Sequence, residues 1–389
     1  MGSGQRIGME SGSMASHRAS PPGGGPAGDL LSGEAGLLDF ADAAIPGLRL
    51  PNGLFCFDRA LNVPALRGES VRYSTMVLLG TLRRAGSGAT VSIDPDDLHR
   101  LIHAQRRHLG VGDLGLLLWS DVRMGDTVAA KATLADLERR SASPSELASV
   151  EGMEAAWFVL GAVAAQAGGL AVGPLVSRAM TELRRRQSPT TPLFRHVGTR
   201  HGRARFPNFA TQIYSLLALT EAARHDVASD AMERAERLAD LLIRSRDAHF
   251  GWPWLFDSER GVVVERYEVY SVHQDAMAPM ALLALAEVTG DKGYADAATE
   301  SLRWGFGNNE LGFWFYDREQ RFAHRSIRRA GLARRLGLYG NTVFSLAGRS
   351  VRVDPGGVEL NATCRPYHLG WILEAWSGRE AIVHEAGRP

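Results

Sequence analysis

The feature that most constrains the fold is the presence of two kinds of helical stretch. One kind is apolar on nearly all sides, as in "FATQIYSLLALTEAARH" and "APMALLALAEVTGD". The other kind, such as "SDAMERAERLADLLIRSRD", has an apolar stripe opposite a charged face. A helix that is apolar all round must be covered on every side, whereas a charged face lies in water. We therefore expect two concentric rings of helices, with the apolar kind inside.

Strand-like alternation of apolar and polar residues is scarce. The main candidates are residues 261–272, "GVVVERYEVYSV", and 350–361, "SVRVDPGGVELN". Residues 1–34 are rich in Gly, Ser and Pro and bury little apolar area, so we expect a disordered tail there. Residues 35–380 are expected to form one all-α domain, followed by a short C-terminal tail over 381–389.

The charge balance and the cysteines exclude several classes of protein. The chain has 389 residues, with 44 basic and 43 acidic side chains and a formal net charge of +1. This balance favours neither nucleic acid nor an anionic membrane surface as a partner. The two cysteines, Cys56 and Cys364, offer no disulfide framework and no Cys-x-x-Cys metal motif, which fits a reducing compartment. We expect a cytoplasmic protein that uses neither a metal nor a cofactor.

One run is close to the length of a membrane span. Ala155–Gly173 contains nineteen uncharged residues, which is near the minimum for crossing a bilayer. The run is dominated by Ala and Gly, which contribute little hydrophobicity, and it contains Gln166. We therefore expect a helix that is buried inside the domain, with no membrane span.

Three stretches share one plan of a glycine, several large apolar residues and a terminal aspartate. They are "LGLLLWSD" (114–121), "FGWPWLFD" (250–257) and "LGFWFYD" (311–317). The glycines of the last two are 61 residues apart, and those of the first two are 136 apart, about two periods of 68. A period of this length corresponds to one helical hairpin, and the shared plan predicts a repeated loop.

The two kinds of helix and the repeated glycine-aromatic loop resemble the α/α-toroid superfamily. It includes six-hairpin glycosidase-like enzymes and sugar epimerases, with terpenoid cyclase-like toroids as another branch. The resemblance implies a single (α/α)6-type toroid in which the loops at one end line a funnel. Trp252 and Trp254 of "FGWPWLFD" would then form a platform for substrate. Large aromatic side chains also serve as wedges between hairpins, and this structural role stays open.

Polar, aromatic and titratable residues are most concentrated in "YEVYSVHQDAMAPMALLAL" (267–285), where they come just before an apolar helix. Pro279 fits only a first helical turn, which predicts that Asp275 is the N-cap. As a site, this stretch offers Asp275 as a catalytic carboxylate and His273 as a proton carrier. Tyr270 and Gln274 would bind substrate. Capping and catalysis are compatible in position, so both interpretations stay open for Asp275.

A second cluster, "ELNATCRPYHLGWILEAW" (359–376), has the same plan around Pro366. Arg365 is suited to clamp a carboxylate or phosphate with its forked guanidinium. His368 is suited to move protons near neutral pH. Tyr367 and Asn361 would bind substrate beside them. The alternative is a surface arginine and a histidine whose hydrogen bonds are satisfied within the fold.

Three further residues complete the prediction. Glu310 in "NNELGFWFYD" is the candidate second carboxylate, against the alternative of a solvated loop residue. Asn208 in "RFPNFATQIY" is a candidate ligand for sugar hydroxyls or a helix cap. Asp96 in "IDPDDL" matches the DxDD pattern of class II terpene cyclases, whose middle aspartate protonates an alkene. The same segment is also a near-ideal helix start, with Asp94 as the cap and Pro95 in the first turn.

These residues together predict a carbohydrate-active enzyme, namely a glycoside hydrolase, lyase or epimerase acting on a sugar or glycan, with an acidic one favoured. Glycosidic cleavage needs two carboxyl groups, whereas elimination or epimerisation beside a carboxylate needs two proton-moving groups. Two alternatives stay open: an isoprenoid cyclase that uses Asp96, and a non-catalytic toroid that binds a glycan or a protein. The arginine-rich run 324–340, which includes Arg325, is expected to be a solvated helix face, and attraction of an anionic substrate or a diphosphate leaving group is the alternative.

Overall fold

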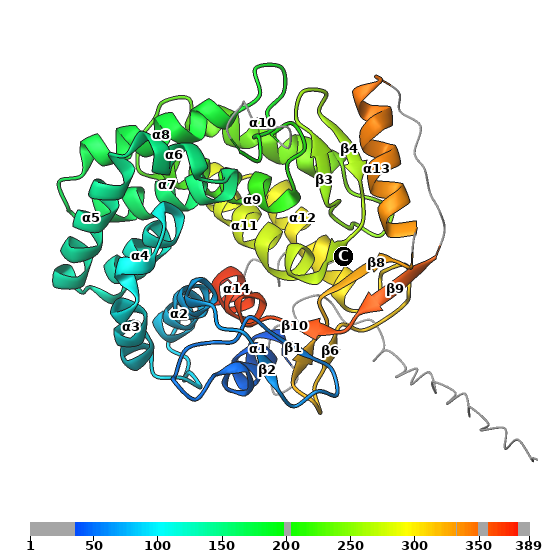
Figure 1. Cartoon of the computed structure of the whole chain (residues 1–389), viewed down its shortest axis with the longest axis horizontal. Coiled ribbons are helices and arrows are strands. Elements are labelled where there is room, and N and C mark those ends of the chain that lie inside the picture. Colours follow the sequence, from blue (N-terminus) through cyan, green and yellow to red (C-terminus); the bar gives the residue numbers. More distant parts are fainter. Residues whose placement is uncertain (1–35, 198–203, 332, 349–356, 380–389) are drawn as a thin grey trace, which may run out of the picture.

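The computed structural model describes residues 36–197, 204–331, 333–348 and 357–379. The predictions for the two terminal tails lie outside these residues. Six helices form a closed inner ring in which each helix packs against the next and the last packs against the first (Figure 1). In chain order they are α2 (Val71–Gly86), α4 (Val111–Met124), α7 (Gly152–Ala167), α9 (Phe209–Arg224), α11 (Ala278–Thr289) and α14 (Pro366–Trp376).

A second set of helices surrounds this ring, and each of them packs mainly against one inner helix. They are α1 (Leu37–Ala44) on α14, α3 (Pro95–Ala104) on α2, α5 (Thr127–Ser141) on α4, α8 (Gly173–Arg186) on α7, α10 (Ala231–Arg244) on α9 and α12 (Lys292–Leu302) on α11. The prediction of two concentric rings is confirmed. The apolar helix α9 is inside, and α10, with its charged face, is outside.

Glycines allow the inner helices to approach each other closely. A Cβ on Gly115 of α4 would lie 2.4 Å from the carbonyl oxygen of Trp157 on α7, and one on Gly161 would lie 2.2 Å from the carbonyl oxygen of Gly115. Gly80 of α2 and Gly370 of α14 face each other in the same way. The prediction that "LGLLLWSD" is a loop was therefore wrong: it lies inside α4, and its glycine serves a helix crossing.

The other two copies of the proposed repeat do share a structure. "FGWPWLFD" ends in β3 (Leu255–Asp257), which pairs with β4 (Val262–Glu265), and "LGFWFYD" ends in β6 (Tyr316–Asp317), which pairs with β7 (Phe322–Ala323). Each terminal aspartate accepts a hydrogen bond from a backbone N–H of the following turn. Asp257 accepts from Glu259 at 3.0 Å, and Asp317 accepts from Gln320 at 2.9 Å.

The remaining strands form two three-stranded sheets. β5 (Val269–Tyr270), β8 (Ser326–Arg329) and β9 (Val358–Asn361) form one antiparallel sheet, and β2 (Leu66–Arg67), β1 (Asp58–Ala60) and β10 (Thr363–Cys364) form another. The run 324–340 was predicted to be a helix face. Its first half is instead strand β8, and α13 (Ala333–Leu346) follows and packs on β4 and β8.

The shorter helical elements lie between the main helices. They are α6 (Pro144–Ser149) and the 3-10 turns Ile45–Leu48, Arg106–His108 and Arg303–Gly305. The run that includes Trp157 forms the buried helix α7, as predicted. Within the described residues, no helix combines the length and the apolar character needed to cross a membrane.

Candidate active site at the N-terminal mouth of the inner ring

All six inner helices begin at the same end of the ring, because each outer helix returns the chain to that end. We call this end the N-terminal mouth and define it by the residues at or near the helix starts: Tyr73, Asp113, Glu154, Tyr214, His273 and His368. Helix N-termini present unpaired N–H groups and the positive end of the helix dipole, which favours anionic ligands. The two residue clusters predicted from the sequence both reach this mouth.

A hydrogen-bonded pair between Asp275 and His368 lies at this mouth. Asp275 is fully buried, and both of its carboxylate oxygens lie 2.8 Å from Nε2 of His368. The hydroxyl of Tyr316 also donates to Asp275, at 2.6 Å. Because a carboxylate only accepts, Nε2 carries the proton, and Nδ1 is the nitrogen that stays available as a base.

The predicted N-cap role of Asp275 was wrong. Residues His273–Met277 form a π-helical turn that precedes α11, so the helical backbone begins before Asp275. Pro279 does lie in the first turn of α11, as predicted. The π-helical turn directs the Asp275 side chain toward His368 on α14, and helix interruptions of this kind are frequent at functional sites.

His273 lies beside this pair in an aromatic environment. Its ring centroid is 4.8 Å from that of Phe209 and 5.0 Å from that of Tyr270, and only 5% of the residue is exposed. Burial, and then the nearby charges of Arg325 and His368, lowers the pKa of His273 to about 3. Its Nδ1 atom has no hydrogen-bond partner among the described residues. A neutral imidazole at physiological pH follows.

Arg365 lies among aromatic rings at the start of α14. Its Nη1 atom donates to the hydroxyl of Tyr73 at 2.7 Å, and its guanidinium lies 4.3 Å from the ring centroid of Phe57. The rings of Tyr73 and Tyr367 are 4.6 Å apart. Burial raises the pKa of Tyr73 to about 12. This part of the mouth therefore combines the positive charge of Arg365 with several neighbouring aromatic rings.

A second arginine, Arg325, approaches from the loop before β8. Its guanidinium lies 5.1 Å from the ring centroid of Tyr270, and its Nε atom is buried without a partner among the described residues. Tyr367 and Glu268 interact with it electrostatically. Glu268 in turn accepts from the hydroxyl of Ser326 at 2.9 Å. Arg325 thus adds a second cation to the mouth.

Three predicted substrate ligands have contacts within the fold. Gln274 is fully buried; it donates to the backbone carbonyl of Tyr270 at 3.0 Å and accepts from the backbone N–H of Trp252 at 2.9 Å. Trp252 is also fully buried and packs on Phe209, which matches the wedge alternative. Trp254 is partly exposed, and its carbonyl oxygen accepts from the backbone N–H of Phe209 at 2.8 Å.

The two predicted asparagines have partners within the fold. Asn208 caps α9 by accepting from the backbone N–H of Thr211 at 2.9 Å, so its predicted cap role is confirmed. Asn361 on β9 accepts from the hydroxyl of Thr363 at 3.1 Å, and its Nδ2 atom lies 3.5 Å from Glu268. Substrate contacts by either residue stay a prediction.

The two predicted catalytic carboxylates, Asp275 and Glu310, have different hydrogen-bond partners. Glu310 accepts from the hydroxyl of Tyr267 at 3.0 Å, and its second oxygen is buried without a partner among the described residues. Asp96 is exposed on the outer helix α3. Asp94 caps that helix by accepting from the backbone N–H groups of Asp96 and Asp97 at 3.0 and 3.4 Å, so the predicted cap at Asp94 is confirmed.

Sequence reasoning missed several residues of the mouth. Arg72 joins three inner helices, because it donates to Asp113 and to Glu154 at 2.5 Å each and lies over the ring of Trp157. Tyr73 follows it in the first turn of α2. The available signal was their place at a helix start, since polar and aromatic residues in that place also marked the two predicted clusters.

One group of side chains within the described residues has the composition of a metal site. His99 and His103 of α3 direct Nε2 toward the same oxygen of the buried Asp121, at 2.7 and 2.8 Å. Thr133 donates to the other oxygen at 2.6 Å. A guanidinium nitrogen of Arg106 lies 3.3 Å from Nδ1 of His103, which leaves Nε2 as the protonated nitrogen. Hydrogen bonds therefore account for this group, which joins α3 and α5 to α4.

Comparisons with known proteins identify the fold. No known protein family and no curated protein matches the sequence. Among solved structures, the chain is similar to an unsaturated glucuronyl hydrolase specific for heparin, with a TM-score of 0.57 and 15% identity over 90% of this chain and 97% of that chain. It is also similar to an unsaturated glucuronyl hydrolase from Bacillus sp. GL1 (TM-score 0.56, 13% identity, 87% and 93% of the two chains).

A sugar epimerase from a ruminal bacterium has a TM-score of 0.58 and 10% identity over 89% of this chain and 98% of that chain. These structures are α/α toroids of the six-hairpin glycosidase-like kind, so the predicted fold and the resemblance are confirmed. At these identities the similarity concerns the fold.

Proposed function

We propose that the chain is a carbohydrate-active enzyme that acts on an acidic sugar at the N-terminal mouth by histidine acid–base catalysis. The observation that carries the proposal is His368, which is oriented by the buried Asp275 and shares the mouth with His273, Arg325 and Arg365. A base, a neutral imidazole and two guanidinium groups are the parts that proton transfer beside a carboxylate needs.

The arginines determine the kind of sugar. Arg325 and Arg365 both lie near Tyr73 and Tyr270. The positive charge of each arginine favours the deprotonated form of both tyrosines and so opposes the rise in their pKa that burial causes. The carboxylate of a uronic acid matches the fork of a guanidinium group, and the helix N-termini around it favour the same charge. The ring faces of Tyr73 and Tyr367 offer apolar surface to a sugar ring.

Histidine chemistry fits the geometry better than a pair of carboxylates. Asp275 is engaged by His368 and Tyr316, and Glu310 is engaged by Tyr267. In an elimination or epimerisation, Nδ1 of His368 would take the proton from the carbon beside the sugar carboxylate. Arg325 and Arg365 would stabilise the negative charge that develops on that carboxylate. His273 would serve as the second proton-moving group.

The structural neighbours support a sugar as the substrate. Two of them are unsaturated glucuronyl hydrolases and one is a sugar epimerase, on the same α/α toroid. A glycoside hydrolase is the second candidate, favoured by the buried oxygen of Glu310 that has no hydrogen-bond partner among the described residues. In that case Glu310 is the acid–base carboxylate, and Glu310→Gln abolishes turnover.

Thermal unfolding of the full chain against a ligand panel tests the proposal. The panel contains neutral sugars, uronic acids, oligosaccharides that contain uronic acids, and prenyl diphosphates with and without Mg²⁺. A ligand that binds only the folded state stabilises it by about 2.7 kcal/mol at a hundredfold excess over Kd. We expect uronic acids or their oligosaccharides to raise the midpoint and neutral sugars to have little effect.

Two variants locate the binding. Arg365→Met should abolish the shift, and Arg237→Met, a matched change of a largely exposed arginine on α10, should retain it. A shift with prenyl diphosphates alone would replace the proposal with the cyclase alternative. Binding without turnover of any bound sugar would leave a non-catalytic toroid.

A further inference from the structure

The opposite end of the inner ring is hollow. We call it the C-terminal mouth, because it is formed by the last turns of the inner helices. One cavity of about 240 Å³ lies among α2, α4, α9, α11 and α14, and a second of about 340 Å³ lies between α4, α7 and α9. Trp119, Arg123 and Glu221 line both cavities, so the two form adjoining lobes of one hollow.

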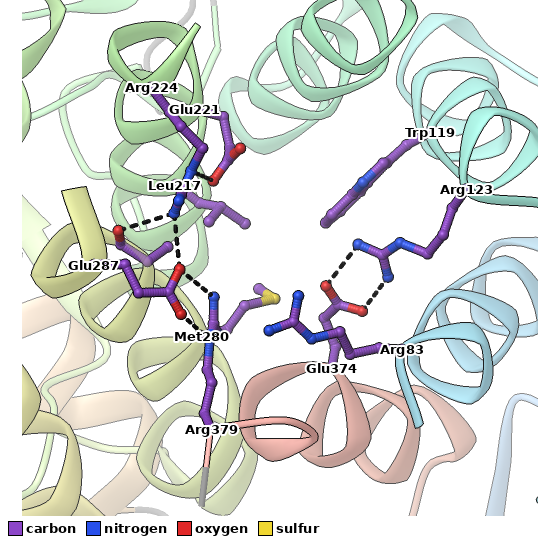
Figure 2. A pocket seen from close by; sticks show the side chains of 11 residues that line it. Arg83, Trp119, Arg123, Leu217, Glu221, Arg224, Met280, Glu287, Glu374 and Arg379 are labelled. Atoms are coloured by element: carbon purple, nitrogen blue, oxygen red, sulfur yellow. Dashed lines mark hydrogen bonds and ion pairs between the residues drawn. The ribbon is translucent and has the colours of Figure 1, made fainter. Parts of the chain in front are cut away.

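Ion pairs surround the first lobe (Figure 2). Arg123 binds Glu374 through two parallel hydrogen bonds. Arg379 donates to Glu287 at 2.6 Å, and Arg224 donates to the same carboxylate at 2.9 Å. In each pair the two opposite charges compensate each other. The pairs connect α4, α9, α11 and α14 or the residues just after them.

Arg83 is the exception in this lobe. Its Nε atom donates to the backbone carbonyl of Ser377 at 3.0 Å, and no carboxylate among the described residues lies within ion-pair distance of its guanidinium. Figure 2 shows this guanidinium directed into the lobe beside Glu374. Burial and the nearby positive charges of Arg379 and Arg123 lower the pKa of Arg83, and the opposing effect of Glu374 and Glu287 does not cancel this. Its positive charge is therefore undercompensated.

The second lobe is largely apolar. The side chains of Val122, Leu160, Val163 and Ala164 line it, and the indole of Trp119 lies between the two lobes. Arg123 lies 4.9 Å from the ring centroid of Trp119 and fixes the position of that ring. The hollow thus places an apolar lobe next to Arg83, which forms no ion pair with a carboxylate in the part of the chain that the structure describes.

We propose that this hollow binds a small organic monocarboxylate with an apolar body, with the carboxylate on Arg83 and the body against Trp119. The two terminal nitrogens of a guanidinium match a carboxylate in a two-pronged geometry. The charge of the lining supports a monoanion. Four arginines face three glutamates in the first lobe, an excess of one positive charge, so a dianion such as phosphate would meet repulsion from the glutamates.

Calorimetric titration of the full chain with phenylacetate tests the proposal, and phenylacetamide is the neutral control of the same shape. We expect phenylacetate to bind at one site per chain and phenylacetamide to bind about 10- to 100-fold more weakly, the range for a hydrogen bond to a charged group. Inorganic phosphate should not compete. Equal affinity for phenylacetate and phenylacetamide, or no binding of phenylacetate, would overturn the proposal.

Variants separate this site from the N-terminal mouth, which also contains arginines. Arg83→Met should lose the preference for phenylacetate, Arg83→Lys should retain part of it, and Arg365→Met should leave it unchanged. Ala164→Phe, which fills the apolar lobe, should weaken both ligands. Binding that is lost in Arg365→Met and kept in Arg83→Met would place the carboxylate at the other mouth and refute the assignment. Circular dichroism melting of each variant checks folding.

Discussion

The two mouths of the inner ring are made by the same six helices but differ in almost every physical property. The N-terminal mouth contains two histidines and several aromatic rings, and its arginines Arg72, Arg325 and Arg365 lie over such rings. The C-terminal mouth contains a circuit of arginine–glutamate pairs around a hollow (Figure 2). The first concentrates groups that transfer protons, and the second concentrates fixed charges.

Helix polarity accounts for part of this difference. The last turns of the inner helices expose carbonyl oxygens, and arginines such as Arg83, Arg123 and Arg224 complement that negative end. The first turns expose N–H groups, and Asp113 and Glu154 occupy them. The parallel orientation of the ring therefore assigns opposite charge preferences to its two ends, and this allows two chemically distinct sites in one domain.

The largest expected effect is at the N-terminal mouth. His368→Asn removes the proposed base, and we expect kcat to fall by about 10²- to 10⁴-fold with little change in KM, because a positioned proton carrier contributes about that much. The measurement is steady-state kinetics on the acidic sugar identified by the ligand panel. Arg237→Met, on the outer ring, is the control that keeps its rate. Rates near wild type in His368→Asn would remove the histidine from the mechanism.

The next effect concerns stability at the C-terminal mouth. Glu374 has only 7% of its side chain exposed, so Glu374→Gln leaves Arg123 without its carboxylate and should lower the free energy of unfolding by about 3 kcal/mol. Urea denaturation measures this change. The matched exposed pair of Glu233 and Arg237 on α10 provides the control, because Glu233→Gln should not shift the midpoint. Equal effects of the two substitutions would show that the pair of Arg123 and Glu374 stabilises the fold no more than an exposed surface pair does.

A pH profile should distinguish the mouths further. The pKa of His273 is about 3 in the folded protein, below the ordinary value near 6.5 that applies when the chain is unfolded. The unfolded chain therefore binds the extra proton first, and stability declines as pH falls from about 6.5 toward 3. We expect urea midpoints at pH 7.5 and 5.0 to differ less in His273→Asn than in the wild type. An unchanged difference would show that this histidine is not held neutral by the fold.

The smallest expected effect concerns Asn208, at the start of α9. Asn208→Ala removes the cap and should lower the free energy of unfolding by about 1 kcal/mol, whereas Asn208→Asp keeps an acceptor for the N–H of Thr211 and should restore it. Thermal unfolding of the two variants measures the difference. If Asn208→Asp keeps stability but loses affinity for the sugar, the residue also contacts substrate.

The sequence predicted well what depends on local pattern. All-apolar stretches formed the inner ring, and Asn208 and Asp94 cap their helices, because both features are determined by neighbouring residues. Two predicted clusters meet at one mouth, since each begins an inner helix. His368 and Asp275 are 93 residues apart, and their contact follows from ring geometry alone.

The wrong predictions concern features that neighbouring residues in the sequence do not determine. Arg325 was placed on a helix face because no neighbouring residue shows that Ser326–Arg329 is a strand. This strand pairs with Val269–Tyr270, which lies earlier in the chain, and with Val358–Asn361, which lies later. Asp275 was placed as a cap because Pro279 marks only the start of the regular helix and gives no sign of a preceding π-helical turn. "LGLLLWSD" resembled a loop because glycine serves turns and close helix crossings equally well.

The closure of the ring by Gly80 of α2 and Gly370 of α14 also has a consequence for biosynthesis. The ring joins its first helix in chain order to its last, so neither mouth is complete until α14 has been made. The contact between Tyr73 and Arg365 belongs to this closure. A message that ends before α14 would therefore produce an open arc of hairpins with an exposed apolar interior, a product suited to degradation rather than to partial activity.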